Sequence, residues 1–139
     1  MAKTVQVKWI EKRQFVGIDG SKHSVVMSSQ DSENGVGMSP SQMLLLALGG
    51  CTSYDVVDIL EKKRQTITGL DVTVTGEQDN DPPWTYRKIH IQYTVRGKGL
   101  KEKAVRDAIE LSEKKYCSVA ATLRGVADIT YEYTIIEDE

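Results

Sequence analysis

Hydrophobic and polar residues alternate in six short stretches of the chain, and helical spacing dominates most of what lies between them. A period of two indicates a strand with one buried face, whereas apolar residues three and four positions apart indicate a helix. On this basis we expect strands at residues 4–10, 13–18, 23–29, 70–78, 86–97 and 127–136. We expect helices at residues 42–64, 100–116 and 117–125.

The expected elements come in blocks: three strands, one long helix, two strands, two helices and a last strand. Blocks of this kind favour an α+β fold over a doubly wound parallel sheet. DGSK at 19–22 is a hairpin-turn signal between the second and third strands. Because 139 residues suit one domain and no repeat or linker interrupts them, we expect a single domain over residues 1–139.

The first expected helix is strongly apolar on every face. Ser39 and Pro40 supply an N-cap and a first-turn proline, and the apolar run MLLLAL follows at 43–48. EKKR at 61–64 places mostly positive charge at the other end, which is favourable to the helix dipole. A helix without a polar face is typical of a buried central helix. A chain of this length has few other elements to cover it, so we expect a homodimer in which a second copy does so.

Composition and charge narrow the classes of function. The chain is 40% hydrophobic and 27% charged, which is ordinary for a soluble globular protein. With a net charge of −2 and no basic stripe, nucleic acid is not an expected partner. The first 14 residues lack the apolar core of a secretory signal, and no uninterrupted apolar run reaches the roughly 20 residues that span a bilayer. We therefore expect a cytoplasmic protein without a membrane partner.

The two cysteines, Cys51 and Cys117, are the residues most suited to chemistry. They lie 66 positions apart, which excludes a C-x-x-C redox or zinc motif. His23 and His90 have no ligand spacing to either cysteine, so we expect neither a metal site nor a cofactor. In a cytoplasmic chain, two cysteines indicate thiol chemistry or a buried core more than a structural disulfide.

Cys51 follows Gly49 and Gly50 within the long helix, and two interpretations stay open. Free cysteine is among the most buried residue types, so Cys51 taken alone is explained as part of the core. Two glycines inside a helix, however, cost roughly 1–2 kcal/mol relative to alanine. They are explained if another backbone packs there, or if a reactant must approach the sulfur closely.

Local electrostatics favour Cys117 as the more acidic thiol. Cys117 begins the last expected helix and follows Lys114 and Lys115, and both features favour a thiolate. Cys51 lies in mid-helix, and Asp55 one turn further on disfavours a thiolate if it shares that face. A thiolate at Cys51 would therefore need a cation from elsewhere in the fold.

Two segments together resemble the family of osmotically inducible protein C (OsmC) and the organic hydroperoxide resistance proteins. They are SPSQMLLLALGGC at 39–51 and KKYCSVAATLRG at 114–125. With the order of elements around them, the resemblance extends over nearly the whole chain. It is nearest to a short bacterial OsmC-like subgroup with a G-G-C helix and a K-Y-C-S-V segment. The resemblance implies antiparallel sheets wrapped around a long central helix, in an intertwined homodimer.

The resemblance also implies a thiol-dependent peroxidase that reduces organic hydroperoxides in oxidative-stress defence. In such proteins the first cysteine attacks the peroxide and becomes a sulfenic acid. The second cysteine resolves it as a disulfide, which a dithiol reductant then reduces. Carried over, Cys51 is the peroxidatic cysteine and Cys117 the resolving cysteine, and a lipoyl protein is one candidate for the reductant.

The family also uses an arginine from a strand near the N-terminus as the cation beside the thiol. Arg13 matches it in position, and an ordinary solvated arginine is the other interpretation. Well-characterised members place a glutamate directly after the proline that begins the long helix, where it holds this arginine. Here Ser41 occupies that position and carries no charge, so either another acid such as Asp55 takes over or the arginine is not held. Arg124 also matches the family segment, and we expect a structural role for it at the helix end.

Two alternatives to catalysis stay open beside the peroxidase. One is a non-catalytic dimer that binds a small apolar molecule in its central cavity. The other is a redox-responsive dimer whose thiols oxidise slowly. Sulfurs within disulfide reach of each other favour the peroxidase or the redox-responsive protein.

Overall fold

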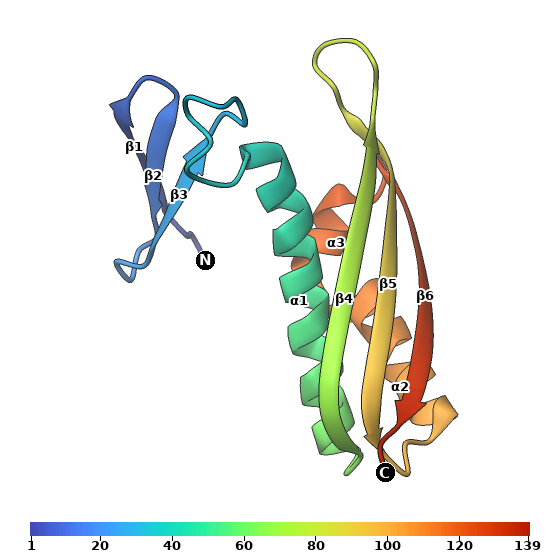
Figure 1. Cartoon of the computed structure of the whole chain (residues 1–139). Helices are drawn as coiled ribbons and strands as arrows, with labels where there is room; N and C mark the ends of the chain where they lie inside the picture. The colour runs from blue at the N-terminus through green and yellow to red at the C-terminus, as the bar shows by residue number, and fades with distance from the viewer. The chain divides into compact units, whose positions relative to one another are not determined.

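The computed structural model describes residues 1–139, which form two units, Met1–Leu44 and Leu45–Glu139. The first unit contains an antiparallel sheet of three short strands (Figure 1). The strands are β1 (Gln6–Glu11), β2 (Gln14–Ile18) and β3 (Ser24–Ser28), in that order across the sheet. Asp19 shapes the turn after β2, because its carboxylate accepts the backbone N–H groups of two residues that follow it. All three strands lie within two residues of their expected positions.

Helix α1 (Pro40–Lys62) begins where the sequence predicts. The hydroxyl oxygen of Ser39 accepts the N–H of Gln42 at 3.3 Å, as an N-cap residue does. One stripe of the helix is buried, and it consists of Leu48, Gly49, Thr52, Val56 and Leu60. Within one chain the helix is not buried on every face, because Leu46 and Tyr54 are 59% and 73% exposed, and its expected cover by a second copy stays a prediction. By length and composition alone α1 could cross a membrane, a property that core helices of soluble proteins share.

The second unit is built on a mixed sheet in the order β4-β5-β6. β4 (Thr66–Gln78) runs antiparallel to β5 (Tyr86–Lys98), whereas β6 (Asp128–Glu137) runs parallel to β5. The expectation of wholly antiparallel sheets is therefore wrong for this pair. The reason is the long helical connection between β5 and β6, which returns the chain to the end of the sheet where β5 began.

That connection contains three consecutive helical segments. They are α2 (Glu102–Leu111), the π-helical turn η1 (Ser112–Tyr116) and α3 (Ser118–Leu123). The helix expected at 100–116 is thus shorter and ends in a wider turn, which hydrophobic spacing does not signal. The helices of the second unit cover one face of its sheet (Figure 1). Alternate residues of β5 enter the core on that face, namely Ile89, Ile91, Tyr93 and Val95.

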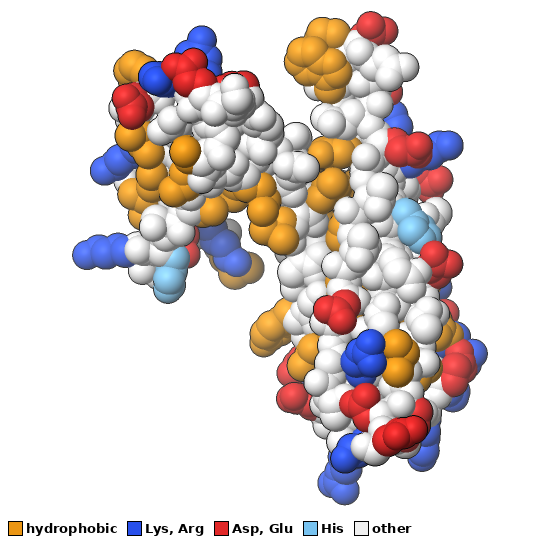
Figure 2. Space-filling model, viewed as in Figure 1, with side chains coloured by type: hydrophobic (Ala, Val, Ile, Leu, Met, Phe, Trp, Pro, Cys, Tyr) orange, Lys and Arg blue, Asp and Glu red, His pale blue; other side chains and the backbone are white.

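The first unit has no comparable core. No hydrophobic residue before Leu48 is buried, and every residue of β1 is exposed. Figure 2 shows the resulting apolar surface over the strands of this unit. Its large exposed members are Val5, Val7, Trp9, Ile10, Val25 and Val26. A three-stranded sheet normally buries one face, so this sheet lacks the covering that a stable sheet requires.

Candidate functional site

The second unit brings the two cysteines together with one carboxylate. The Sγ atoms of Cys51 and Cys117 and an oxygen of Asp55 all lie within 4.8 Å of one another. Cys51 and Asp55 occupy successive turns of α1, whereas Cys117 immediately precedes α3. Both cysteines are free thiols. A disulfide requires sulfurs about 2.05 Å apart, so the two Sγ atoms must approach each other by at most about 2.8 Å to be joined.

The two thiols differ in their environments. Cys51 is half-buried, whereas Cys117 is only 2% exposed. Burial raises the pKa of Cys117 to about 12, and a hydrogen bond with the Cys51 thiol adds to the rise. The prediction that its position favours a thiolate at Cys117 is therefore wrong. The N–H of Ala120 does point at its sulfur, at 3.3 Å, but burial outweighs that donor.

The carboxylate of Asp55 is held by a residue of the π-helical turn. The buried Ser112 donates its hydroxyl hydrogen to Oδ2 of Asp55, with the two oxygens 2.8 Å apart. π-helical turns occur often at functional sites, and this one carries two polar residues into the interior, Ser112 and Glu113. The sequence predicts two roles for Asp55, as a charge that disfavours a thiolate at Cys51 and as a substitute for the family's glutamate, and it gives no signal for Ser112.

A second hydrogen-bonded pair joins the same turn to β5. The hydroxyl of Tyr93 donates to Oε1 of Glu113 at 2.6 Å, and both side chains are buried. Burial raises the pKa of Glu113. Burial and the hydrogen bond to Glu113 raise the pKa of Tyr93. Arg124 donates to the backbone carbonyl of Glu113, a structural contact of the kind expected for it. The one sequence signal for Glu113 is its position four residues before Cys117.

Arg13, the third residue of the predicted site, lies in the first unit at the turn between β1 and β2. It is exposed, and its guanidinium donates to the carbonyl of Lys12 at 3.3 Å. Its backbone N–H donates to the side chain of Asn34, also at 3.3 Å. The cluster of Cys51, Asp55 and Cys117 belongs wholly to the second unit.

The two glycines before Cys51 face different surroundings. A Cβ atom on Gly49 would lie 3.0 Å from a methyl carbon of Val74 in β4, so this glycine lets α1 approach the sheet of its own chain. A Cβ atom on Gly50 would meet nothing within 4 Å. Close packing therefore explains Gly49, and within the chain it does not explain Gly50.

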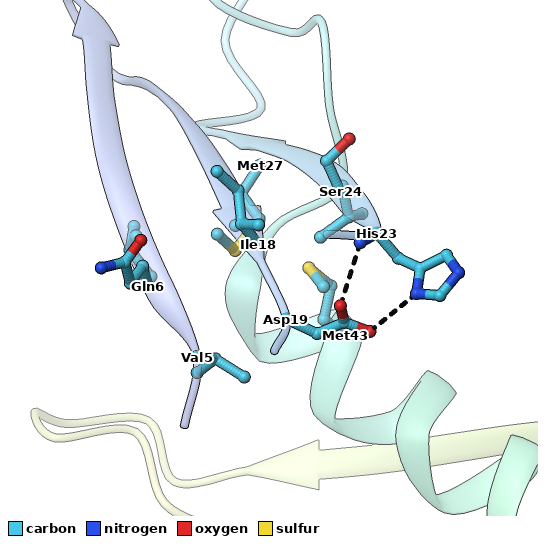
Figure 3. Close-up of a pocket in the computed structure, with 11 residues that line it drawn as sticks. Val5, Gln6, Ile18, Asp19, His23, Ser24, Met27 and Met43 are labelled. Atoms are coloured by element: carbon cyan, nitrogen blue, oxygen red, sulfur yellow. Dashed lines mark hydrogen bonds and ion pairs between the residues drawn. The ribbon is translucent and has the colours of Figure 1, made fainter. Parts of the chain in front are cut away.

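An apolar pocket of about 370 Å³ lies in the first unit (Figure 3). It is bordered by the exposed face of the small sheet and by the start of α1. Its apolar lining includes Val5, Val7, Ile18, Val25, Met27 and Met43. His23 stands at its edge, with Nδ1 3.1 Å from Oδ2 of Asp19.

Comparison with known proteins places this arrangement in a family. The OsmC-like protein family model matches residues 30–132. Protein YhfA of Escherichia coli is 37% identical over 131 residues, which cover 94% of this chain and 96% of that protein. The crystal structure of an OsmC-like protein from Mycoplasma pneumoniae superposes with a TM-score of 0.85 at 20% identity, over 98% of both chains.

A more distant likeness shares the fold alone. The organic hydroperoxide resistance protein OhrB of Bacillus subtilis superposes with a TM-score of 0.63 at 13% identity, over 96% of this chain and 98% of that one. The resemblance that residues 39–51 and 114–125 carry is thus confirmed by a match of the family model to most of the chain. The chain belongs to the OsmC family.

Proposed function

We propose that this protein is a thiol-dependent peroxidase that reduces organic hydroperoxides, with Cys51 and Cys117 as its redox pair. The observation that carries the proposal is the proximity of a half-buried thiol and a buried thiol in one cluster. Membership of a family that includes organic hydroperoxide resistance proteins supports the choice of substrate class.

The proposed reaction has two steps in the protein. The sulfur of Cys51 attacks the outer oxygen of ROOH, the O–O bond breaks, and the products are Cys51–SOH and the alcohol ROH, which takes up the thiol proton. The thiol of Cys117 then attacks the sulfur of Cys51–SOH. The S–O bond breaks, a disulfide forms and water leaves. An external dithiol reduces the disulfide and becomes a disulfide itself.

Exposure supports this division of roles. A peroxide must reach the first sulfur from solvent, and Cys51 is the more accessible thiol. The second step is internal, so the burial of Cys117 does not obstruct it. In this proposal Arg13 supplies the cation that favours the Cys51 thiolate, as the resemblance implies.

The remaining parts of the proposal concern the assembly and its setting. We infer that the protein is an intertwined homodimer, because the apolar sheet of the first unit and the exposed residues of α1 lack a cover within one chain. We further infer that residues 1–139 form a single domain. The protein acts in the cytoplasm, and a dithiol such as a lipoyl protein reduces its disulfide.

Stopped-flow thiol measurements test the peroxidase directly. Reduced protein is mixed with a slight excess of cumene hydroperoxide, and the loss of free thiols is followed over time. We expect rapid loss of two thiols per chain, abolished in Cys51→Ser and diverted to a sulfenic acid in Cys117→Ser. Arg13→Ala is expected to slow the first step, whereas Lys8→Ala, at an exposed cation of β1, is not. Thiols that react no faster than free cysteine would exclude catalysis.

One observation favours a second candidate function, the binding of a small apolar molecule. The pocket of the first unit is lined mainly by apolar side chains, and none of its residues is a cysteine (Figure 3). A solvatochromic apolar probe should then bind the wild-type protein and lose affinity for Val25→Lys, which places a charge in the lining. Equal binding to both proteins would exclude the pocket as the site.

A further inference from the structure

The proposed peroxide chemistry uses two sulfurs of the cluster and leaves the carboxylate without a role. Cys51, Asp55 and Cys117 nevertheless present three possible metal ligands within 4.8 Å of one another. The spacing of Cys51 and Asp55, four residues apart on one helix, directs both side chains to the same face. We propose that the reduced protein binds one Zn²⁺ ion through these three side chains, with a fourth position open to water.

The donor set selects the metal. Two thiolates and one carboxylate match the ligands of zinc, whereas magnesium and calcium require mostly oxygen donors. Three protein ligands and one open position are the arrangement of zinc sites that exchange a water molecule. Donor atoms on one tetrahedral zinc lie about 3.5–3.8 Å apart, so the distances within the cluster must shorten by about 1.3 Å at most.

Contacts around the cluster already orient two of the ligands. The hydroxyl of Ser112 donates to Oδ2 of Asp55 and so restricts the orientation of this carboxylate. The N–H of Ala120 points at Sγ of Cys117 and would stabilise the thiolate form that coordination creates. Metal sites commonly hold their ligands through a second layer of hydrogen bonds of this kind.

The cluster has a route to solvent. Asp55 borders an open surface hollow of about 560 Å³, which also touches Asp58, Lys62 and Tyr116. Lys62 is paired with Asp58 at 2.8 Å, so its charge is partly neutralised there. An ion can therefore reach the carboxylate of Asp55 from this hollow, which Lys63 also lines.

Zinc binding at this cluster depends on the oxidation state of the sulfurs, and it does not rest on the proposed peroxidase. A two-electron oxidant such as diamide joins the two sulfurs and takes up two electrons and two protons. The disulfide leaves only the carboxylate as a strong ligand. The oxidised protein should therefore lose the ion.

Titration of the metal-free, phosphine-reduced protein with Zn²⁺ against a chelating indicator measures the affinity, and Co²⁺ serves as the spectroscopic probe. We expect one ion per chain and a thiolate-to-cobalt charge-transfer band. Both should disappear after diamide treatment. The band should weaken in Cys51→Ser and in Cys117→Ser, because each change removes one thiolate.

The acidic residues of α1 provide the matched comparison. Asp55→Asn should lower the zinc affinity about tenfold or more and keep the charge-transfer band. Asp58→Asn, which alters a carboxylate in the same hollow, should bind as the wild type does. Circular dichroism shows whether each variant is folded. If Asp55→Asn is not folded, the zinc affinity of Cys51→Ser alone tests the proposal. The proposal is wrong if Cys51→Ser binds zinc like the wild type, or if the folded Asp55 and Asp58 variants have equal affinity.

Discussion

At the scale of single residues, the two thiols differ in their access to solvent. Cys117 is 2% exposed and its pKa is raised to about 12, so it is neutral and shielded at physiological pH. Cys51 is half-buried. Thiol chemistry from solvent should therefore begin at Cys51.

Alkylation of the reduced protein tests this order. With iodoacetamide at neutral pH, we expect Cys51 to be labelled first and Cys117 at least about tenfold more slowly, because only thiolates react and only one site is accessible. Peptide mass spectrometry at successive times measures both rates. Denatured protein, in which both cysteines should react alike, is the control. Faster labelling of Cys117 would contradict the assignment of roles.

Glu113 gives a pH-dependent contribution to stability. Burial raises its pKa above the ordinary 4.5, so the folded state holds the proton more tightly than the unfolded state. Below the ordinary pKa the carboxyl is protonated in both states, and its contribution to the free energy of unfolding is fully present there. As pH rises from there, the unfolded state ionises first and the free energy of unfolding falls, until the pH exceeds the folded-state pKa.

Glu113→Gln should remove this pH-dependent loss of stability, and its amide oxygen can still accept the hydroxyl hydrogen of Tyr93. Urea denaturation of both proteins, from below pH 4.5 up to neutrality, measures the difference in their free energies of unfolding. We expect the variant to gain on the wild type as pH rises. A difference that does not change with pH would show that the carboxyl titrates alike in both states.

At the scale of elements, Gly49 and Gly50 of α1 differ in their packing, because only Gly49 lies against the sheet of its own chain. Gly49→Ala should destabilise the protein by about 1 kcal/mol, because its methyl group would press on Val74 in β4. Gly50→Ala should stabilise the chain by about 0.5–1 kcal/mol, because nothing within the chain opposes the better helix former. Thermal and urea unfolding measure both changes. Destabilisation by Gly50→Ala, together with weaker dimerisation, would instead locate a partner chain at Gly50.

The elements themselves follow from the sequence more readily than their pairing does. Alternation and helix caps predict all six strands and the start of α1, because these signals are local. The parallel pairing of β5 with β6 depends on the route of the connection, which no local pattern encodes. The π-helical turn at Ser112–Tyr116 likewise has no signature in hydrophobic spacing.

For the candidate site too, the sequence predicts some features and not others. Family resemblance finds Cys51 and Cys117, and their spacing alone does not show that they meet. The high pKa of Cys117 arises from burial and from the Cys51 thiol, which are tertiary effects. The charges of Lys114 and Lys115 therefore do not predict the pKa of Cys117, because both lysine side chains are exposed and burial of the thiol has the larger effect.

At the scale of the whole molecule, the first unit requires a cover for its sheet. Val7 is 61% exposed on a strand with no buried residue. If a second copy covers this sheet, Val7→Asp should raise the dimer dissociation constant about tenfold or more, because a charge would enter an apolar interface.

Light scattering after size-exclusion chromatography measures this change. Lys8→Asp introduces the same side chain at the next position of β1, which points to the opposite face of the sheet, and it should have a smaller effect. A wild-type protein that is monomeric at all concentrations would contradict the dimer.

The parallel pairing of β5 with β6 also sets an order of events during synthesis. Cys51 leaves the ribosome 66 residues before Cys117, and β6 emerges after both of them. Pairing between distant strands forms slowly, so the segment that carries Cys117 docks late. Before then, a peroxide that reached the nascent chain would oxidise Cys51 while no second thiol of the chain lies beside it. Once the segment that carries Cys117 has docked, its thiol lies close enough to condense with a sulfenic acid at Cys51 and form a disulfide within the chain.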